Sequence, residues 1–343
     1  MSQDNDLFAD AARQLLADQC TPAVVRAIES GGRDAPEATA LWAQLESTGL
    51  ADALLSEDDG GAGLGLSQAF GVLEQCGAHA LPLPLAETML ARALLARAGV
   101  ARPAGSIALA RGDTTADGGL RCALVRGGRV AQSVLVQAGD AWHLLAVGGA
   151  QAAPQALALD AALAWSADAV RAAPVVAVDV APDLRTLQAA VLAPQMAGAL
   201  AHVFQRTLQY ANERQQFGRP IGKFQAIQHQ LAVMSEHVFA ARMAAQLGCS
   251  GAGVQPDRLR VATAKARCSE AALAVAELAH SIHGAIGFTE EYDLQLFTRR
   301  LHAWRQSAGS ESYWHDVAGQ ALLAHRGLTL DMVRRITDVE STL

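Results

Sequence analysis

The hydrophobic pattern changes twice along the chain, and this limits the possible folds more than any single motif. From about Leu7 to Ala98, apolar residues recur at i, i+3 and i+4, for example in "LFADAARQLLADQ", which is typical of amphipathic helices. Between about Arg102 and Pro182 the pattern becomes short β-like runs, such as "RCALVRGG" and "PVVAVDV", separated by Gly and Asp. After Pro182 the helical period returns. We therefore predict a mainly α fold with a small β domain, divided into an N-terminal helical domain (residues 1–100), a middle β domain (101–182) and a C-terminal helical bundle (183–343).

Glycine and proline positions mark expected helix boundaries. Gly49 and Gly77 lie where helices should end, and Pro194 should kink its helix or mark a late start. The segment "DRLRVATAKARCSEAALAVAELAHSIHG" is Ala-rich and apolar on more than one side, which is typical of a helix buried between neighbours or subunits. An oligomer is therefore expected.

Composition narrows the class of protein. No apolar run approaches the roughly 20 residues that a membrane helix needs, and the start "MSQDNDLFADAARQ" is acidic where a targeting signal would be basic, so we expect a soluble, cytoplasmic chain without a membrane partner. Five scattered cysteines without a C-x-x-C arrangement fit reduced thiols. The formal net charge of −7 argues against nucleic acid, although Arg299 and Arg300 could hold one anionic ligand.

Three motif-like patterns favour structural explanations. The cluster "DDGGAGLGLS" follows no predicted strand, lacks the G-x-G-x-x-G register and carries two aspartates that would repel phosphate, so it is interpreted as a turn between helices. His280 and His283 have metal-ligand spacing but no suitably spaced third ligand, so no metal site is predicted. No "G-x-S-x-G" supports a Ser/His/Asp nucleophile.

The stretch "ERQQFGRPIGKFQAIQH" is harder to explain structurally. Its charges could be surface residues of a helix, and Gly218-Arg219-Pro220 could be a plain turn. However, the stretch closely resembles the "ERxQFGxPIxxFQ" signature of the acyl-CoA dehydrogenase family. "LEQCG" followed by "LPLPLAETML" looks like the end of that family's N-terminal helical domain, and "HGAIGFTEEYDLQLFTRR" looks like its "GGxGFxxEyxxxxxxRD" segment. The resemblance covers essentially the whole chain.

The resemblance implies an acyl-CoA dehydrogenase-like fold with helical, β and four-helix domains, assembled as a homotetramer or a related oligomer. Such enzymes bind FAD and remove two hydrogens from the α and β carbons of an acyl-CoA, then pass electrons to an acceptor protein. By position in the motif, Arg214 would reach the FAD pyrophosphate across a subunit interface, Phe217 would pack near the adenine, and Gln225 would lie at the adenine end. The family's Gln and Gly-Gly pair near the pyrophosphate correspond to the partly matching Ser281, Gly284 and Ala285.

Both positions at which the family places its catalytic base lack an acid. An ungapped alignment on the segment ending in "YEGT" puts Ala308 at the usual glutamate, and the alternative position, 22 residues before Tyr210, is Gln188. The β region is also shorter than the family's middle domain and has no counterpart of its "TEPxAGSD" loop or "WIT" strand. The resemblance therefore implies a reduced β domain and an eroded site on the flavin-ring side.

These losses favour the hypothesis of a short subunit of a heteromeric acyl-CoA dehydrogenase, which completes the FAD site of a partner that carries the glutamate. Relatives of this kind form α₂β₂ enzymes that act on bulky CoA thioesters, for instance in bacterial steroid side-chain degradation. One alternative is a self-sufficient dehydrogenase with an unusual base, for which Glu311, Glu290 and Glu291 are candidates. Another is a scaffold or regulatory subunit without FAD.

Overall fold

The computed structural model describes residues 2–177, 183–251 and 253–338, with side chains from Leu7 onward. The chain forms two compact units: Met1–Val72 with Leu81–Gln188, and Leu73–Ala80 with Ala189–Leu343. The N-terminal helices and the strands between residues 107 and 176 thus belong to the first unit. The end of "PVVAVDV" and the proposed boundary at residue 182 lie outside the described residues, and the division into domains 1–100, 101–182 and 183–343 remains a prediction.

The helical part of the first unit is organised around one buried helix. Its helices are α1 (Ser2–Gln19), α2 (Pro22–Gly31), α3 (Pro36–Ser47), α5 (Leu85–Arg97) and the short α6 (Ala167–Ala172), and α4 (Leu66–Ala78) begins there. Every residue of α5 from Leu85 to Leu95 is buried, including two charged ones. Glu87 pairs with Arg126, and the Arg92 guanidinium donates to Asp52 and Glu46. Each buried charge thus has an opposite partner, which offsets the cost of its desolvation.

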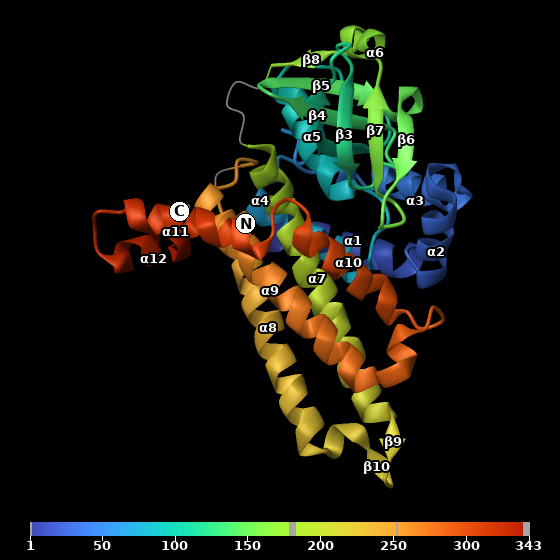
Figure 1. Ribbon diagram of the computed structural model, residues 1–343, viewed down its shortest axis with the longest axis vertical. Helices are drawn as coiled ribbons and strands as arrows, with labels where there is room; N and C mark the ends of the chain where they lie inside the picture. Colours follow the sequence, from blue (N-terminus) through green and yellow to red (C-terminus); the bar gives the residue numbers. More distant parts are fainter. Residues whose placement is uncertain (1, 178–182, 252, 339–343) are drawn as a thin grey trace. The chain divides into compact units, whose positions relative to one another are not determined.

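The β region folds as two sheets that share one core (Figure 1). Among the described residues, one four-stranded sheet has the order β1-β4-β5-β8 and the other the order β2-β3-β7-β6. In the first sheet β1 is parallel to β4, and the remaining pairs are antiparallel. The strands are β1 (Ile107–Arg111), β2 (Asp113–Thr114), β3 (Leu120–Val125), β4 (Ser133–Ala138), β5 (Ala141–Ala146), β6 (Gln151–Pro154), β7 (Ala161–Trp165) and β8 (Val175–Val176).

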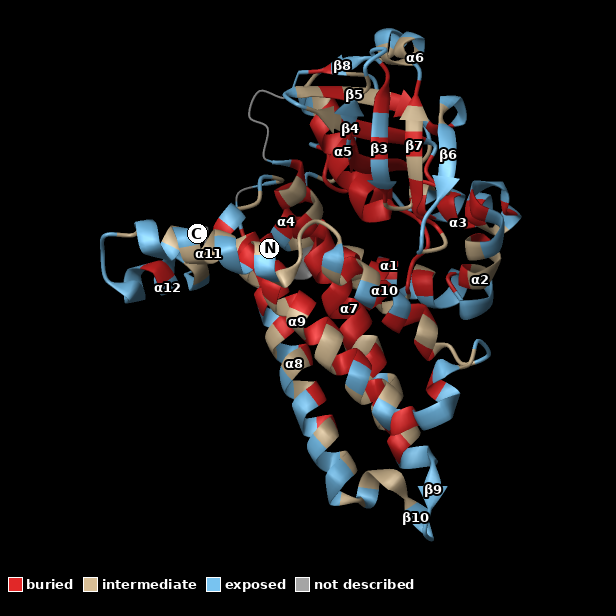
Figure 2. Cartoon of the chain, in the orientation of Figure 1, coloured by how far each residue is buried: buried red, intermediate tan, exposed pale blue. Residues whose placement is uncertain are grey.

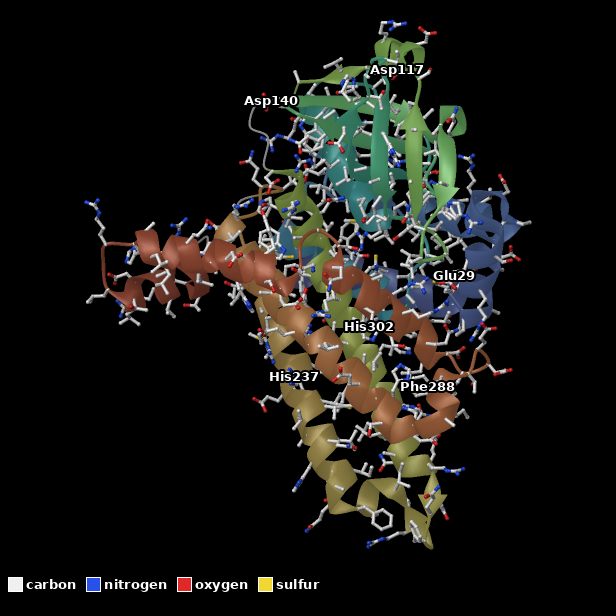
Figure 3. All side chains as sticks on the ribbon, in the orientation of Figure 1. Glu29, Asp117, Asp140, His237, Phe288 and His302 are labelled. Atoms are coloured by element: carbon white, nitrogen blue, oxygen red, sulfur yellow. The ribbon has the colours of Figure 1, made fainter. Side chains whose placement is uncertain are left out.

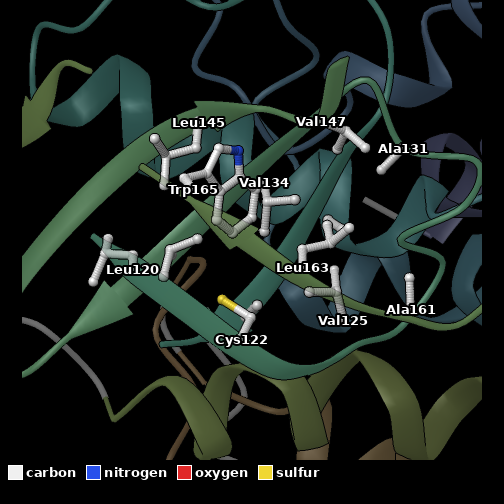
Figure 4. Packing of buried hydrophobic residues seen from close by; sticks show 13 residues of the cluster. Leu120, Cys122, Val125, Ala131, Val134, Leu145, Val147, Ala161, Leu163 and Trp165 are labelled. Carbon is white, nitrogen blue, oxygen red and sulfur yellow. The ribbon is translucent and has the colours of Figure 1, made fainter. Parts of the chain in front are cut away.

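The inner faces of the two sheets supply a single hydrophobic cluster (Figure 4). Val134 and Leu145 come from one sheet, and Cys122, Leu163 and Trp165 come from the other. The alternating burial of β7, in which every second residue is buried, is the period-two pattern of a strand with one face on a core. The predicted small β domain is therefore a compact sandwich.

The second unit is a bundle of long helices (Figure 1). Its helices are α7 (Leu184–Glu213), α8 (Gln225–Cys249), α9 (Arg258–His283), α10 (Leu294–Gln306), α11 (Glu311–Ala324) and α12 (Thr329–Thr337). Helix α9 packs against α8, α10 and α11, and buried residues run along much of α7 and α9 (Figure 2). The predicted fold class, mainly α with a small β part, is confirmed.

Pro194 lies inside α7, ten residues after the helix begins at Leu184. The alternative that the helix starts at this proline is therefore wrong. A proline has no N–H, so the carbonyl of Ala190 loses its helical donor. The buried thiol of Cys249 lies 3.7 Å from that oxygen and donates to it. A neighbouring helix thus partly satisfies the carbonyl that the proline leaves open.

Glycine is required for different reasons at the two positions that were expected to be helix ends, Gly49 and Gly77. Gly49 follows α3 with a φ of 73°, the left-handed conformation of a helix C-terminus, as predicted. Helix α4 ends at Ala78, one residue past Gly77. A Cβ at Gly77 would overlap the carbonyl oxygen of Gln195 in α7, and a Cβ at Gly198 would overlap that of Glu74 in α4. Gly77 and Gly198 therefore permit the close crossing of these two helices.

Two segments, Leu184–Glu213 and Arg258–Phe288, are long and apolar enough to cross a membrane by length and composition. The core helices of soluble proteins pass the same test, so two such segments are weak evidence for a membrane protein. In the most apolar part of the first segment 78% of residues are buried, against 44% in the second. The first segment therefore has the burial of a core helix, and the cytoplasmic location remains a prediction.

Because α4 and α7 cross so closely, we expect a single added methyl group at the crossing to lower stability. Gly77→Ala and Gly198→Ala should each lower the free energy of unfolding by about 1 to 3 kcal/mol, because the added carbon meets backbone that cannot rotate away. Urea unfolding measures this. Gly319→Ala in α11 is the matched control, because a Cβ there meets nothing within 4 Å, and it should be neutral or stabilising by up to about 1 kcal/mol. A Gly77→Ala chain as stable as the wild type would contradict the packing.

Candidate functional site

A two-residue hairpin turn presents Phe217 at the end of α7. Strands β9 (Gln215–Gln216) and β10 (Arg219–Pro220) pair through Gln216 and Arg219, so Phe217 and Gly218 form the turn. Their φ angles are 51° and 78°, as in a type I′ turn. Such a turn favours Asn or Gly, and phenylalanine is strained there. Phe217 is 90% exposed, and its one ring contact among the described residues is the edge of Phe224, so burial does not explain this choice.

Beside this turn is a pocket of about 560 Å³ in the second unit. Five of the six residues predicted to bind a cofactor line it, although they come from two segments far apart in sequence. The five are Arg214, Phe217, Ser281, Gly284 and Ala285. Gln225 does not line the pocket; it is the exposed first residue of α8, directly after the lining residue Phe224.

The pocket combines an available cation with an aromatic wall. The Arg214 side chain is exposed, and the described part of the chain offers it no acidic partner. Phe217 and Phe224 meet edge to face with ring centroids 6.1 Å apart, and the Arg219 guanidinium lies 4.2 Å from the Phe224 ring centre. A guanidinium beside apolar rings can bind an anionic group that carries a flat ring system.

Sequence reasoning missed several lining residues. Phe224 and Ile221 lie within the quoted motif, so their position beside Phe217 was a signal that could have identified them. Tyr210 and His283 gave no such signal, because their contact appears only in the folded chain. The remaining lining residues without an assigned role are Gln216, Ile227, Ile282 and Ile286.

The floor of the pocket is a stack of aromatic rings around His283, which ends α9. Its ring lies against Tyr210 of α7, with centroids 4.4 Å apart, and its Nε2 lies 3.1 Å from the Tyr292 hydroxyl. Burial lowers the pKa of His283 and raises that of Tyr292. His280 contacts other groups: its Nε2 lies 3.1 Å from the Thr298 hydroxyl, and its ring stacks on that of Phe288. Phe288, labelled in Figure 3, is exposed. The two histidines thus have separate hydrogen-bond partners.

The usual base position lies in a tightly held turn between α10 and α11. Ala308 has a φ of 54°, and its carbonyl accepts a hydrogen bond of 2.9 Å from the Trp314 indole. The ammonium of fully buried Lys265 donates to the carbonyls of Gly309 and Arg305 at 2.9 and 3.0 Å. The backbone of this turn is therefore fixed, while its side chain at position 308 is a methyl group that holds no proton.

The other candidate bases are either committed to structural contacts or exposed. In the first unit the Gln188 amide donates to the Leu109 carbonyl of β1 at 2.9 Å. Glu311 begins α11 and pairs with Arg305, which lowers the pKa of the Glu311 carboxyl. Glu290 and Glu291 are exposed between α9 and α10. A carboxylate with a lowered pKa is a poor proton acceptor at neutral pH.

Family models match most of the chain. The acyl-CoA dehydrogenase N-terminal domain matches residues 2–102, and the acyl-CoA dehydrogenase C-terminal domain matches residues 185–323. The chain belongs to the acyl-CoA dehydrogenase family. Acyl-CoA dehydrogenases are oxidoreductases, so the predicted enzyme class is confirmed.

Two relatives match this chain over almost its whole length. Acyl-CoA dehydrogenase IpdE2 of Mycolicibacterium smegmatis is 30% identical over 311 residues, which is 90% of this chain and 96% of the relative. The solved structure of the "Tcur3481-Tcur3483 steroid ACAD G363A variant" has a TM-score of 0.81 and 25% identity, and covers 94% of this chain and 98% of its own. The ChsE4-ChsE5 complex from Mycobacterium tuberculosis, at 23% identity with the same coverage, shares the fold with a TM-score of 0.82.

Because Phe217 is strained in its turn, we expect its replacement by asparagine to stabilise the fold. Phe217→Asn should raise the free energy of unfolding by about 0.5 to 1 kcal/mol, because asparagine tolerates the left-handed conformation and the exposed ring contributes little packing. Thermal or urea unfolding of the isolated chain measures the change. Gly218→Ala, at a φ of 78°, should destabilise and serves as the opposite control. A less stable Phe217→Asn chain would show that the ring stabilises the fold.

Proposed function

We propose that this chain is a short subunit of a heteromeric acyl-CoA dehydrogenase, and that it completes the FAD site of a partner subunit that carries the catalytic glutamate. The observation that carries this proposal is a contrast within one unit. The pocket is lined by five residues that the sequence predicts to contact FAD: Arg214, Phe217, Ser281, Gly284 and Ala285. The turn at the usual base position instead holds Ala308, whose backbone is locked in place.

The residues present fit the ADP half of FAD. A pyrophosphate needs positive charge and N–H donors, and Arg214 supplies a guanidinium that no described acid neutralises. Gly284, with a φ of 63° and nothing within 4 Å of its Cβ position, leaves room for a ligand to approach the backbone. Phe217 and Phe224 offer apolar faces and edges to a purine. The pocket chemistry is thus that of an anionic group joined to an aromatic ring.

FAD, when bound at such a site, would supply the acceptor for the hydride from the β-carbon of the acyl-CoA. Arg214 would bind and orient the pyrophosphate, and Phe217 would hold the adenine side and exclude water from it. Neither residue takes a proton. The α-proton then requires a carboxylate from the partner, since Gln188 donates to Leu109 and Ala308 has no acidic group.

The solved relative at 25% identity supports a heteromeric assembly and a bulky substrate. Its name, Tcur3481-Tcur3483 steroid ACAD, joins two proteins and refers to a steroid. We extend both features to this chain: its partner is another acyl-CoA dehydrogenase subunit, its substrate is a large, steroid-like CoA thioester, and an electron-transfer protein reoxidises the flavin.

Removal of the Arg214 charge tests the assignment directly. The chain is co-expressed with an acyl-CoA dehydrogenase subunit that carries the catalytic glutamate and forms a stable complex with it, and FAD affinity of the purified complex is measured by flavin fluorescence. Arg214→Ala should weaken FAD binding by about 10- to 100-fold, which corresponds to about 1.5 to 3 kcal/mol for a charge-assisted contact.

The matched control is Lys223→Ala, which removes the same charge from an exposed neighbour that does not line the pocket. It should leave FAD affinity within about twofold, since long-range charge effects are screened by salt. Full FAD occupancy in the Arg214→Ala complex would refute the pyrophosphate role. A stable wild-type complex without any flavin would instead favour the scaffold alternative.

The ion pair of Glu311 predicts a structural effect without a catalytic one. Because its folded pKa lies below the ordinary value of 4.5, the carboxylate stabilises the fold above that pH and loses this contribution as pH falls through the folded pKa. Glu311→Gln should therefore lower stability at pH 7, and the difference from the wild type should shrink below about pH 4.5. Turnover of the complex per bound FAD should stay unchanged. Turnover by the isolated wild-type chain, abolished by Glu311→Gln, would support a self-sufficient enzyme and overturn the proposal.

A further inference from the structure

We propose that His283 is a positioning residue whose neutral ring holds the Gly284–Ala285 turn at the pocket, so that uptake of one proton by this ring weakens nucleotide binding. This inference rests on the proposed function, because it concerns the same pocket. It assigns a role to a residue that the cofactor motif leaves without one.

His283 is held on every side. It is the last residue of α9, is 4% exposed, and lines the pocket. Its Nδ1 lies 2.8 Å from the Ala279 carbonyl, and its Nε2 lies 3.1 Å from the Tyr292 hydroxyl. Its own carbonyl accepts a hydrogen bond of 3.3 Å from the Tyr210 hydroxyl, whose ring stacks on the imidazole. Ring and backbone of this one residue are therefore fixed together.

These contacts determine where the next two residues lie. Gly284 follows His283 directly with a φ of 63°, and its N–H donates to the His280 carbonyl, which closes α9. The chain then continues as a 3₁₀ helix through Phe288. A tilt of the His283 ring would move the Tyr210 contact and the Gly284–Ala285 turn at once, and Tyr210, Gly284 and Ala285 all line the pocket.

The hydrogen bonds also define the protonation state that this arrangement needs. A carbonyl oxygen only accepts, so the proton of the neutral ring lies on Nδ1 and faces Ala279. Nε2 is then an acceptor, and the Tyr292 hydroxyl donates to it. In the imidazolium both nitrogens are donors, so the Tyr292 hydroxyl must reverse and find a new acceptor for its proton.

The surrounding charges oppose that reversal. Arg206 of α7 hydrogen-bonds to the Tyr292 side chain, and its guanidinium lies 5.1 Å from the Tyr292 ring centre. A protonated His283 would therefore place a second cation at the same hydroxyl. His280 of α9 adds repulsion, while Glu213 of α7 acts on Tyr292. No carboxylate contacts the His283 ring among the described residues, so a positive charge there lacks compensation.

Burial lowers the pKa of His283 from 6.5, with Arg206 and His280 acting in the same direction. The ring is therefore neutral at pH 7, and its proton binds more weakly in the folded than in the unfolded chain. The sign follows from linkage: falling pH favours the unfolded chain below 6.5, and within the folded chain it favours the state in which the stack is released.

The test compares His283→Gln and His283→Ala in the co-expressed complex. Glutamine can donate to Ala279 and accept from Tyr292 but does not titrate near neutral pH. FAD dissociation is followed by flavin fluorescence from pH 8 to 5. The wild-type complex should bind FAD uniformly from pH 8 to 6.5 and lose affinity once the pH falls through the folded pKa of His283, which lies below 6.5, by up to about tenfold per pH unit. His283→Gln should bind within about threefold of the wild type at pH 7 without the acid loss, whereas His283→Ala should bind more weakly at every pH.

His315→Gln is the matched control, because this histidine is exposed and pairs with Glu270 on the surface. It should keep the acid loss of the wild type. An unchanged acid loss in His283→Gln, or wild-type affinity in His283→Ala, overturns the inference while leaving the proposed function intact. A complex that holds no FAD, or whose FAD ignores Arg214→Ala, overturns the proposed function and the nucleotide part of the inference together.

A second readout needs no flavin. Urea unfolding of the isolated full chain should show stability that rises with pH below 6.5, and His283→Gln should reduce that slope whereas His315→Gln should not. Equal slopes for the wild type and His283→Gln would overturn the assignment of the titrating group.

Discussion

The contact between Tyr210 and His283 is the interaction on which the pocket depends. It joins the end of α7 to the end of α9, two points 73 residues apart in sequence. Together with the packing of α8 on α9, it fixes the hairpin that presents Arg214 and Phe217 relative to the Gly284–Ala285 turn. The contact combines ring stacking with a hydrogen bond to the backbone, so it fixes both distance and orientation. The stacked rings and this hydrogen bond thereby hold two distant chain segments on either side of the pocket.

Two places in the second unit differ in whether their polar side chains have partners within the chain. Around Ala308 they do: Lys265 and Trp314 donate hydrogen bonds to the backbone of the turn, and Arg305 pairs with Glu311. At the pocket the opposite holds, because Phe217 is strained and exposed and Arg214 faces no described acid. Backbone strain does not separate the two places, because Ala308 and Phe217 have φ angles of 54° and 51°. The pocket differs in its exposed aromatic residue and in a guanidinium without a described acidic partner, and both groups are available to a ligand.

Local signals in the sequence predicted much of the fold, and distant contacts account for what they missed. The change of hydrophobic period identified the sandwich, and Gly49 marked a helix end, because both are properties of neighbouring residues. The reason for Gly77 lies in a second helix, 118 residues away at Gln195, and no local pattern contains it. Five of the motif positions line the same pocket, whereas Gln225 does not line it and His283, which the motif omits, does. Their contact with a cofactor remains a prediction. Whether a residue lines the pocket depends on which face of its helix points toward the pocket, and a sequence motif does not specify that orientation.

In the proposed function this chain contributes binding groups to a flavin site but does not contain a complete one. The most direct measurement is the FAD content of the purified complex with its partner, from flavin absorbance against protein concentration, together with that of each chain alone. The proposed function predicts one FAD for each pair of unlike chains in the complex and almost no FAD on this chain by itself. One FAD for every chain in the complex, or a full complement on this chain alone, would contradict it.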